Sequence, residues 1–242
     1  MRVSIIIPTY NEVRTIRACL EAARRLDGDF EVLVVDGLSD DGTPEVVRTA
    51  GVACYPAPRG RAAQMNEGAR RAGGAALLFL HADTLLPAEA HRLIEAALSD
   101  PGTGGGCFRL AFDADHPVLR FSSFFTRWNN GLFHYGDAAY FVRADLFRRI
   151  GGYREELPIL EDLDLWRRLL RRTRLVVVDG AVTTSARRFV RHGPVRQQLT
   201  NVLIVVLYLL GAHPARLERL YRPTTTKRRT DGVEIREPSR SG

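Results

Sequence analysis

Two acidic residues stand at the ends of predicted buried strands, where their carboxylates can accept hydrogen bonds from a ligand. The stretch 77–84 is predicted to be a strand with Asp83 at its end, because the apolar run 77–80 needs cover on both faces. Asp36 follows a strand predicted over 31–35. Open α/β sheets bind ligands at the carboxyl ends of their strands, so both residues are binding-site candidates. Alternatively, each residue only shapes the turn after its strand.

A second acidic pair, Glu161 and Asp162, begins a predicted helix. A carboxylate placed there can take a proton from a nearby hydroxyl group and so act as a general base. The acids lie in the first turn and arginines in the last, as the helix dipole favours, so they could also serve only to stabilise the helix. The helix is indicated by one apolar stripe, formed by Leu163, Trp166, Leu169 and Leu170.

The segments before Asp83 alternate between strands and helices, which predicts a parallel sheet with right-handed crossovers. Strands are predicted over 3–7, 31–35 and 52–55, with helices beginning near residues 16, 43 and 62. The strand ends at Thr9, Asp36 and Asp83 should therefore converge on one crevice at the edge of the sheet.

Two common nucleotide-binding motifs are absent from the sequence. No G-x-G-x-x-G follows the first strand, which disfavours a dinucleotide-dependent oxidoreductase, and no G-x-x-x-x-G-K-[ST] occurs. The glycine run 102–106 precedes a strand predicted over 108–112 and is expected to be a flexible connection. A nucleotide would therefore have to be held by side chains and a metal.

The net charge of +7 comes almost entirely from arginine, since Lys227 is the only lysine. This excess suits an anionic partner such as a nucleotide diphosphate or a phospholipid surface. Nucleic acid is disfavoured because no recognised RNA- or DNA-binding module appears. Cys19, Cys54 and Cys107 lack a C-x-x-C pairing, which argues for a reducing compartment and against disulfides or a zinc site.

Four segments together resemble the family 2 glycosyltransferases, which have the GT-A fold. Segments 4–12 (SIIIPTYNE), 34–43 (VVDGLSDDGT) and 81–83 (HAD) resemble the nucleotide-binding half of that family. Segment 60–69 (GRAAQMNEGA) is closer still to a bacterial subgroup associated with radical-SAM enzymes and selenium-linked genes.

The resemblance covers about residues 3–222 and implies an α/β fold with a Rossmann-like nucleotide-binding half and a mostly parallel central sheet. It implies a single domain over 1–222. The expected parts are a nucleotide-binding half (1–100), an acceptor half (101–180), a C-terminal helical segment (181–222) and a disordered tail (223–242).

A nucleotide-sugar donor, UDP-linked in the simplest case, is implied by the resemblance. Asp36 matches the residue that contacts uracil or ribose. Arg61 could pair with the diphosphate, because a guanidinium binds phosphate oxygens bidentately; the alternative is a surface charge at a helix start. The other positions expected to bind nucleotide are Pro8, Thr9, Tyr10, Glu12, Gln64, Asn66 and Ala82.

Asp83 matches the last Asp of the family's D-x-D motif, which implies a divalent cation, Mn²⁺ or Mg²⁺, at the diphosphate. His81 stands where the first Asp would be. In an extended strand the two side chains point to the same side. His81 is therefore expected to ligate the metal or to hydrogen-bond a phosphate, unless it only packs behind the site.

Glu161 and Asp162 match the family's Glu-Asp motif, which implies that Asp162 is the general base and that Glu161 orients the acceptor. Gly136, Asp137 and Trp166 are the expected sugar- and acceptor-binding residues.

Two further segments are assigned roles beside the catalytic pair. The aromatic stretch 121–128 is expected to be core or, alternatively, to line a hydrophobic acceptor groove. The segment 185–193 is implied to close over the donor, with Arg187, Arg188 or His192 reaching the diphosphate.

These features predict a metal-dependent, inverting glycosyltransferase with a small-molecule or lipid-linked acceptor of unknown identity. One alternative is a nucleotidyltransferase that makes nucleotide-sugars, although the glycine- and lysine-rich loop it would need after the first strand is missing. Another is a non-catalytic, membrane-associated binding module.

The longest apolar run, 202–212, is too short for a spanning helix, and the N-terminal residues do not read as a signal peptide. The run lies in a helix predicted over 195–211 and flanked by arginines. Packing on the domain, self-association as a homodimer and shallow membrane contact through 195–212 all remain open for it. The expected location is the cytoplasm, free or at the inner face of the membrane.

Overall fold

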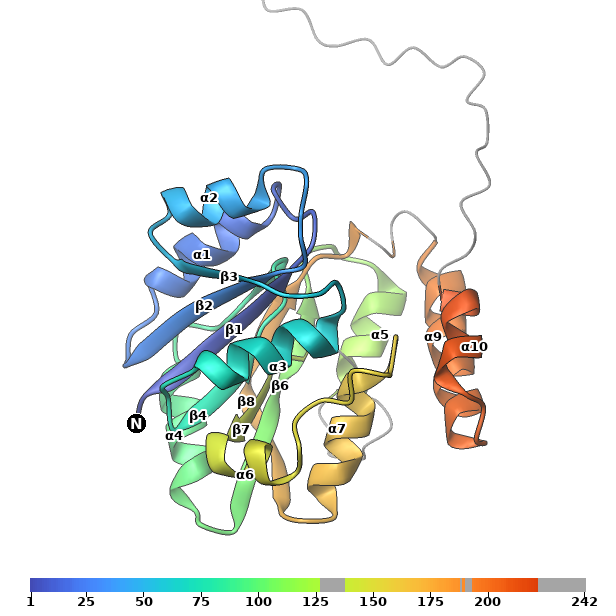
Figure 1. The fold of residues 1–242 in the computed structure, drawn as a ribbon. Coiled ribbons are helices and arrows are strands. Elements are labelled where there is room, and N and C mark those ends of the chain that lie inside the picture. Colours follow the sequence, from blue (N-terminus) through green and yellow to red (C-terminus); the bar gives the residue numbers. More distant parts are fainter. Residues whose placement is uncertain (127–137, 188, 190–192, 222–242) are drawn as a thin grey trace, which may run out of the picture.

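The computed structural model describes residues 1–126, 138–187, 189 and 193–221 and contains an eight-stranded sheet flanked by helices (Figure 1). The first elements are β1 (Val3–Thr9), α1 (Ile16–Arg24), β2 (Phe30–Asp36), α2 (Thr43–Thr49), β3 (Ala53–Pro56), α3 (Arg61–Arg71), β4 (Ala76–Phe79), β5 (Thr84–Leu85) and α4 (Ala90–Ser99). The later ones are β6 (Thr103–Phe112), α5 (Pro117–Phe125), β7 (Tyr140–Arg143), α6 (Ala144–Arg149), α7 (Glu161–Leu170), β8 (Arg174–Thr184), α9 (Pro194–Leu209) and α10 (Pro214–Tyr221).

The sheet is mostly parallel, as predicted, with strand order β3-β2-β1-β4-β7-β6-β8-β5. The first four strands in this order are parallel to one another, whereas β7 runs antiparallel to β4 and β6. Side chains of β1 alternate between two hydrophobic clusters, Ile6 on one face and Ile5 and Ile7 on the other. Helix α3 packs on the Ile6 face and α1 on the opposite one, so both faces of β1 are buried.

Strand β4 is shorter than the sequence predicts. It ends at Phe79, which pairs with Tyr140, the first residue of its antiparallel neighbour β7. The chain then turns: Thr84 N donates to the His81 carbonyl at 3.1 Å, and Thr84 begins β5 beside β8. The prediction that His81 and Asp83 lie on one extended strand is therefore wrong; both residues lie in a turn.

The glycine run 102–106 is also different from expectation, since most of it belongs to β6 and is buried. A Cβ on Gly105 would lie 2.5 Å from the backbone oxygen of Phe141, and one on Gly106 would collide with the backbone oxygen of Val176. Glycine is present because β7 and β8 approach β6 closely from both sides. The run is a packed strand rather than a flexible connection.

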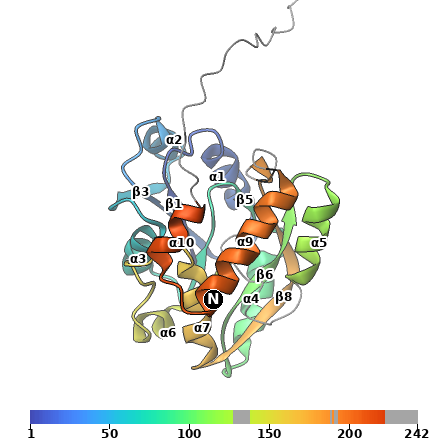
Figure 2. The ribbon, with the colours of Figure 1, turned by 90° about the vertical axis from the view of Figure 1, so that its right-hand side faces the viewer.

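Helices α9 and α10 form the last described part of the chain and pack beside each other (Figure 2). Ile204 and Leu217 join the two helices to Ile159, in the segment before α7. Within the described residues, no helix combines the length and the apolar character needed to cross a bilayer.

The glycine packing in β6 can be tested with Gly105→Ala. The added methyl group must displace the backbone of β7, which overpacks the sheet and should lower the free energy of unfolding by about 1–3 kcal/mol. Gly73→Ala is the matched control, since a Cβ there meets only Glu31 oxygens at 3.7 Å. Equal urea midpoints for the two variants would show that β6 tolerates a side chain at residue 105.

Candidate active site

Side chains from six parts of the chain meet beyond the carboxyl ends of β1, β2 and β4. They come from the ends of β1 and β2, the turn after β4, the first turns of α3 and α7, and the segment after β8. The convergence of Thr9 and Asp36 follows directly from the parallel register, in which the two residues are paired.

Asp36 is buried and tightly held at the end of β2. Its Oδ1 accepts hydrogen bonds from Thr9 Oγ1 at 3.0 Å and from Ser39 Oγ at 2.6 Å, and its Oδ2 accepts from Ser39 N at 2.8 Å. A carboxylate offers about four acceptor positions, so Oδ2 can still accept from an N–H or hydroxyl group of a ligand. Ser39 was not singled out from the sequence, although it lies in the segment 34–43 that carries the family resemblance.

Gln64 fixes the position of this edge. Its Nε2 donates to the backbone oxygens of Thr9 at 2.6 Å and Val35 at 2.8 Å, so one buried amide ties α3 to the ends of both strands. This geometry makes Gln64 a positioning residue for Asp36 rather than a residue facing a ligand.

Arg61, the first residue of α3, connects the turn after β4 to the start of α7. Its Nη2 donates to Asp162 Oδ2 at 3.1 Å, and its Nε lies 3.1 Å from Glu161 Oε1 as an ion pair without hydrogen-bond alignment. The same Nη2 contacts Nε2 of His81. One half-exposed guanidinium thus compensates two buried carboxylates, which explains why a cation is tolerated at a helix N-terminus.

Asp162 lies in an environment that favours its protonated form. Burial, followed by the adjacent Glu161 carboxylate, raises the pKa of Asp162 to about 7, against the opposing effects of Arg61 and His81. The buried Tyr153 hydroxyl lies beside it, and burial together with Asp162 raises the Tyr153 pKa well above its usual range. A carboxylate with a pKa near 7 can both accept and hold a proton at neutral pH. Tyr153 carried no sequence signal that would have identified it.

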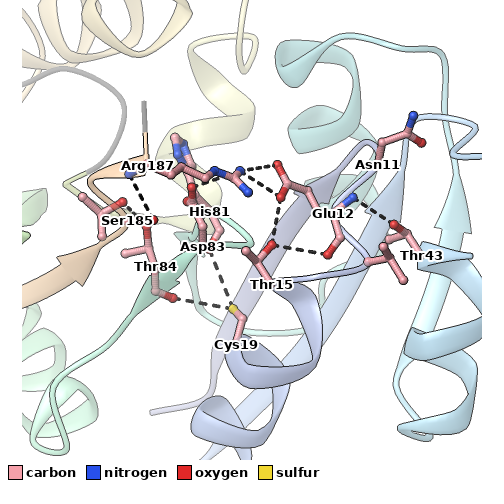
Figure 3. Close-up of polar contacts among 12 residues, drawn as sticks. Asn11, Glu12, Thr15, Cys19, Thr43, His81, Asp83, Thr84, Ser185 and Arg187 are labelled. Carbon is pink, nitrogen blue, oxygen red and sulfur yellow. Dashed lines mark hydrogen bonds and ion pairs between the residues drawn. The ribbon is translucent and has the colours of Figure 1, made fainter. Parts of the chain in front are cut away.

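Arg187 occupies the centre of the other half of the site (Figure 3). Its Nη2 lies 3.2 Å from Asp83 Oδ2 and donates to both Glu12 oxygens, at 2.8 and 2.9 Å. Ser185 N donates to the Asp83 carbonyl at 3.2 Å, which ties the end of β8 to the same turn. The sequence placed Arg187 among three cations that could reach a diphosphate; Arg188 and His192 lie outside the described residues.

Cys19 supports the turn that carries Asp83. Its Sγ lies 3.7 Å from the His81 oxygen and 3.6 Å from the Thr84 oxygen (Figure 3). Burial, with a contribution from the charge of Asp83, raises the pKa of Cys19 to about 12, so the thiol stays protonated and can donate. Cys19 is buried on α1.

The donor set for a divalent cation is small but sufficient for one that also binds phosphate. No group of three or more His, Cys, Asp or Glu side chains suited to a metal occurs among the described residues. Mg²⁺-type sites commonly use one or two carboxylates, with phosphate oxygens and water completing the shell. Asp83 and His81 fit that arrangement only when a diphosphate supplies further oxygens and Arg187 releases the Asp83 carboxylate.

The remaining predicted site residues divide into those at the edge and those behind it. Pro8 and Tyr10 lie at the end of β1, with the Arg59 guanidinium 3.9 Å from the Tyr10 ring centre, and Ala82 is buried in the turn before Asp83. Asn66 instead makes two hydrogen bonds to the backbone of Tyr153. Its Nδ2 donates to the Tyr153 oxygen and its Oδ1 accepts from the Tyr153 nitrogen, both at 2.9 Å.

Trp166 lies inside the core, 1% exposed and packed against Tyr140, a position that does not present its ring to an acceptor. Gly136 and Asp137 lie outside the described residues.

Strained backbone concentrates around this edge. Among the described residues, the four non-glycine positions with positive φ are Asn11, Leu38, Ala139 and Leu160. Asn11 and Leu38 follow β1 and β2, and Leu160 directly precedes Glu161. Such conformations cost on the order of 1–3 kcal/mol each and cluster at functional sites, which supports a binding role for this edge.

A separate hollow of about 710 Å³ lies between the end of β6 and α5. Its lining includes Arg109, Phe112, Asp113, Leu119 and Phe124. Phe121 and Phe124 are exposed, so these two residues of the aromatic stretch are not part of the core.

Comparison of the sequence with protein families gives one match. The family described as glycosyl transferase family 2 matches residues 4–155. Among curated proteins, the "PGL/p-HBAD biosynthesis glycosyltransferase" of Mycobacterium bovis is 32% identical over 183 residues, which cover 66% of this chain and 66% of that protein. "Glycosyltransferase AglE" of Haloferax volcanii is 38% identical over 91 residues, or 34% of this chain and 30% of that protein. The chain thus spans from under a third to about two thirds of these relatives.

Solved structures share the fold at low sequence identity. The mannosyltransferase PcManGT from Pyrobaculum calidifontis, in complex with GDP-Man and Mn²⁺, superposes with a TM-score of 0.64 at 22% identity, over 90% of this chain and 68% of that one. Residues 1–349 of S. aureus TarS in complex with UDP-GlcNAc give 0.63 at 20% identity, over 91% and 70%. The predicted GT-A fold is therefore confirmed.

The raised pKa of Asp162 makes a prediction about stability. Because the pKa rises from 3.8 to about 7 on folding, the folded state binds more protons than the unfolded state between these values and loses stability as pH increases through them. Asp162→Asn cannot ionise, so it should be more stable than wild type above pH 7, by about 1–3 kcal/mol, in urea denaturation.

Asp164→Asn is the contrasting control, because Asp164 accepts from Arg154 at 3.2 Å and Arg168 at 2.7 Å. Removing that charge should destabilise the protein on both sides of pH 7. If Asp162→Asn were likewise less stable than wild type at about pH 5 and about pH 8, Asp162 would be an ordinary ion-pair partner and its pKa would not be raised.

Proposed function

The chain belongs to glycosyl transferase family 2, and from that premise we propose that it transfers a sugar from a nucleotide-sugar to an acceptor hydroxyl with inversion. The donor is UDP-linked in this proposal, and the acceptor is a small molecule or a lipid-linked one. The observation that carries it is the ion-pair network in which Arg61 joins the buried Glu161 and Asp162 to the turn of His81 and Asp83.

In the proposed donor complex, the uracil ring and the ribose of the nucleotide contact Asp36, and the diphosphate lies between Arg61 and Arg187. Asp36 Oδ2 accepts from the uracil N3–H or a ribose hydroxyl, since Thr9 and Ser39 already hold the carboxylate in place. Phosphate oxygens replace the carboxylates as partners of the two guanidinium groups, which bind phosphate bidentately.

The proposed cation, Mn²⁺ or Mg²⁺, would be held by Asp83 and His81 together with the diphosphate, and it would neutralise charge on the leaving group. Support comes from the mannosyltransferase neighbour, whose complex contains GDP-Man and Mn²⁺. In this chain Arg187 must leave Asp83 before the carboxylate can bind a cation.

Asp162 is proposed to be the general base. As the acceptor oxygen attacks the anomeric carbon, its proton passes to the Asp162 carboxylate, and the bond between that carbon and the diphosphate oxygen breaks. The diphosphate leaves with the bonding electrons, and attack from the opposite face inverts the anomeric centre. Glu161 orients the acceptor hydroxyl.

The base assignment predicts different effects on chemistry and on binding. Asp162→Asn keeps the shape of the side chain but cannot take a proton, so kcat for transfer should fall by roughly 10²–10⁴-fold. Affinity for UDP, measured by calorimetry, should stay close to that of wild type. Equal losses in kcat and UDP affinity would instead make Asp162 part of the nucleotide site.

The metal assignment predicts a loss that depends on the cation. Asp83→Ala should weaken UDP binding in the presence of Mn²⁺ and leave the much weaker binding without Mn²⁺ nearly unchanged, as calorimetry with and without the ion can show. Asp145→Ala, which removes an exposed carboxylate paired with Arg149 on α6, is the control. The assignment is wrong if Mn²⁺ still strengthens UDP binding to the Asp83 variant as much as to wild type.

A further inference from the structure

Helix α9 exposes a continuous apolar face to solvent. The exposed positions recur at spacings of three and four residues, which places them on one side of the helix. Their exposed fractions run from 39% to 78%. They are Val195, Leu199, Val202, Leu203, Val206, Leu209 and Leu210.

The side of α9 that faces the protein buries the polar Gln197 together with the apolar Ile204 and Val205. Gln197 is buried and donates to Asn201 Oδ1 at 2.9 Å, and Gln198 accepts from Ser122 of α5 at 3.4 Å. A surface helix normally directs its polar residues to water and its apolar stripe to the core. The outer face of α9 is more apolar than a solvent-exposed helix face normally is. This indicates that another surface binds to it.

Exposed arginines lie on α9 and on the helices at both sides of it, and we refer to these residues together as the arginine rim. Figure 2 looks onto α9 with α10 on one side and α5 on the other. Arg196 of α9, Arg216 and Arg219 of α10, and Arg120 of α5 are all exposed, and α9 contains no acidic residue. Phe121 and Phe124 of α5 add exposed apolar surface at one edge.

Two other occupants fit this face poorly. The chain beyond α10, residues 222–242, contains only two large aliphatic residues, Val233 and Ile235, too few to cover the stripe. A second copy packed through α9 would surround the seam with arginines of both copies, with no acidic residue on either α9 to pair with them.

We propose that the outer face of α9, with the adjoining edge of α5, docks onto a membrane surface that contains anionic lipids. The apolar stripe of this 16-residue helix, about 24 Å long, enters the boundary between headgroups and acyl chains, and the arginine rim meets lipid phosphates. The segment 188–193 is short, so Arg187 lies within about 25 Å of the start of α9. Docking would therefore hold the candidate active site near the bilayer.

The test measures co-sedimentation of the full-length protein with vesicles of phosphatidylcholine, with and without phosphatidylglycerol. The test variant carries Leu199→Gln, Leu203→Gln and Val206→Gln together, which removes apolar surface and leaves every charge unchanged. The control is Leu170→Gln, an exposed leucine on α7. Circular dichroism and UDP affinity show whether each variant remains folded, and ultracentrifugation without lipid gives the oligomeric state.

Wild type and the control should bind the phosphatidylglycerol vesicles more tightly than phosphatidylcholine alone, and the triple variant should lose roughly tenfold or more of that partitioning. Three results overturn the proposal. Wild type can fail to bind anionic vesicles. A folded triple variant can bind as wild type does, which would assign binding to charge elsewhere. The wild-type protein can be a dimer and the triple variant a monomer, which would show that this face binds a second copy of the chain.

Discussion

The structure places two adjacent acidic side chains, Glu161 and Asp162, in buried positions opposite a single guanidinium. Isolated charges of this kind are expensive to remove from water, so they persist only when a partner and the surrounding fold hold them. Arg61 supplies the positive charge from α3, and the start of α7 supplies the anions. The positions of both helices on the sheet are therefore coupled to the electrostatics of one small region.

This balance of charge is suited to exchanging one anion for another. Arg61 and Arg187 each contact carboxylates of the protein, and these carboxylates are the groups that a diphosphate would replace in the proposed complex. A dianionic or trianionic ligand can replace those partners at little electrostatic loss. Release of Asp162 from Arg61 would in turn raise the pKa of Asp162 further, which is consistent with the proposed role as a base.

Periodicity predicted the six elements from β1 to α3 and their order, because each of these strands and helices carries its own pattern, and parallel pairing then placed Thr9 beside Asp36. The Arg61–Asp162 ion pair could not be predicted from the sequence, because it joins residues 101 positions apart through packing that no local pattern describes. The end of β4 was misjudged because a partner strand, not the apolar run, sets it. Glycines 104–106 have no side chains that could show the alternation of a strand, so β6 was predicted to begin too late. Trp166 was predicted to bind the acceptor, although it belongs to the apolar stripe that identified its helix and packs in the core.

The central claim is that this charged edge binds a nucleotide diphosphate, and a crystal structure with UDP and Mn²⁺ tests it most directly. In that structure we expect the uracil ring to contact Asp36 and the diphosphate to contact Arg61 and Arg187. We also expect the Asp83 carboxylate to bind the cation and Arg61 to have moved away from Asp162. Nucleotide bound instead in the hollow between β6 and α5, with the Arg61 ion pairs intact, would contradict it.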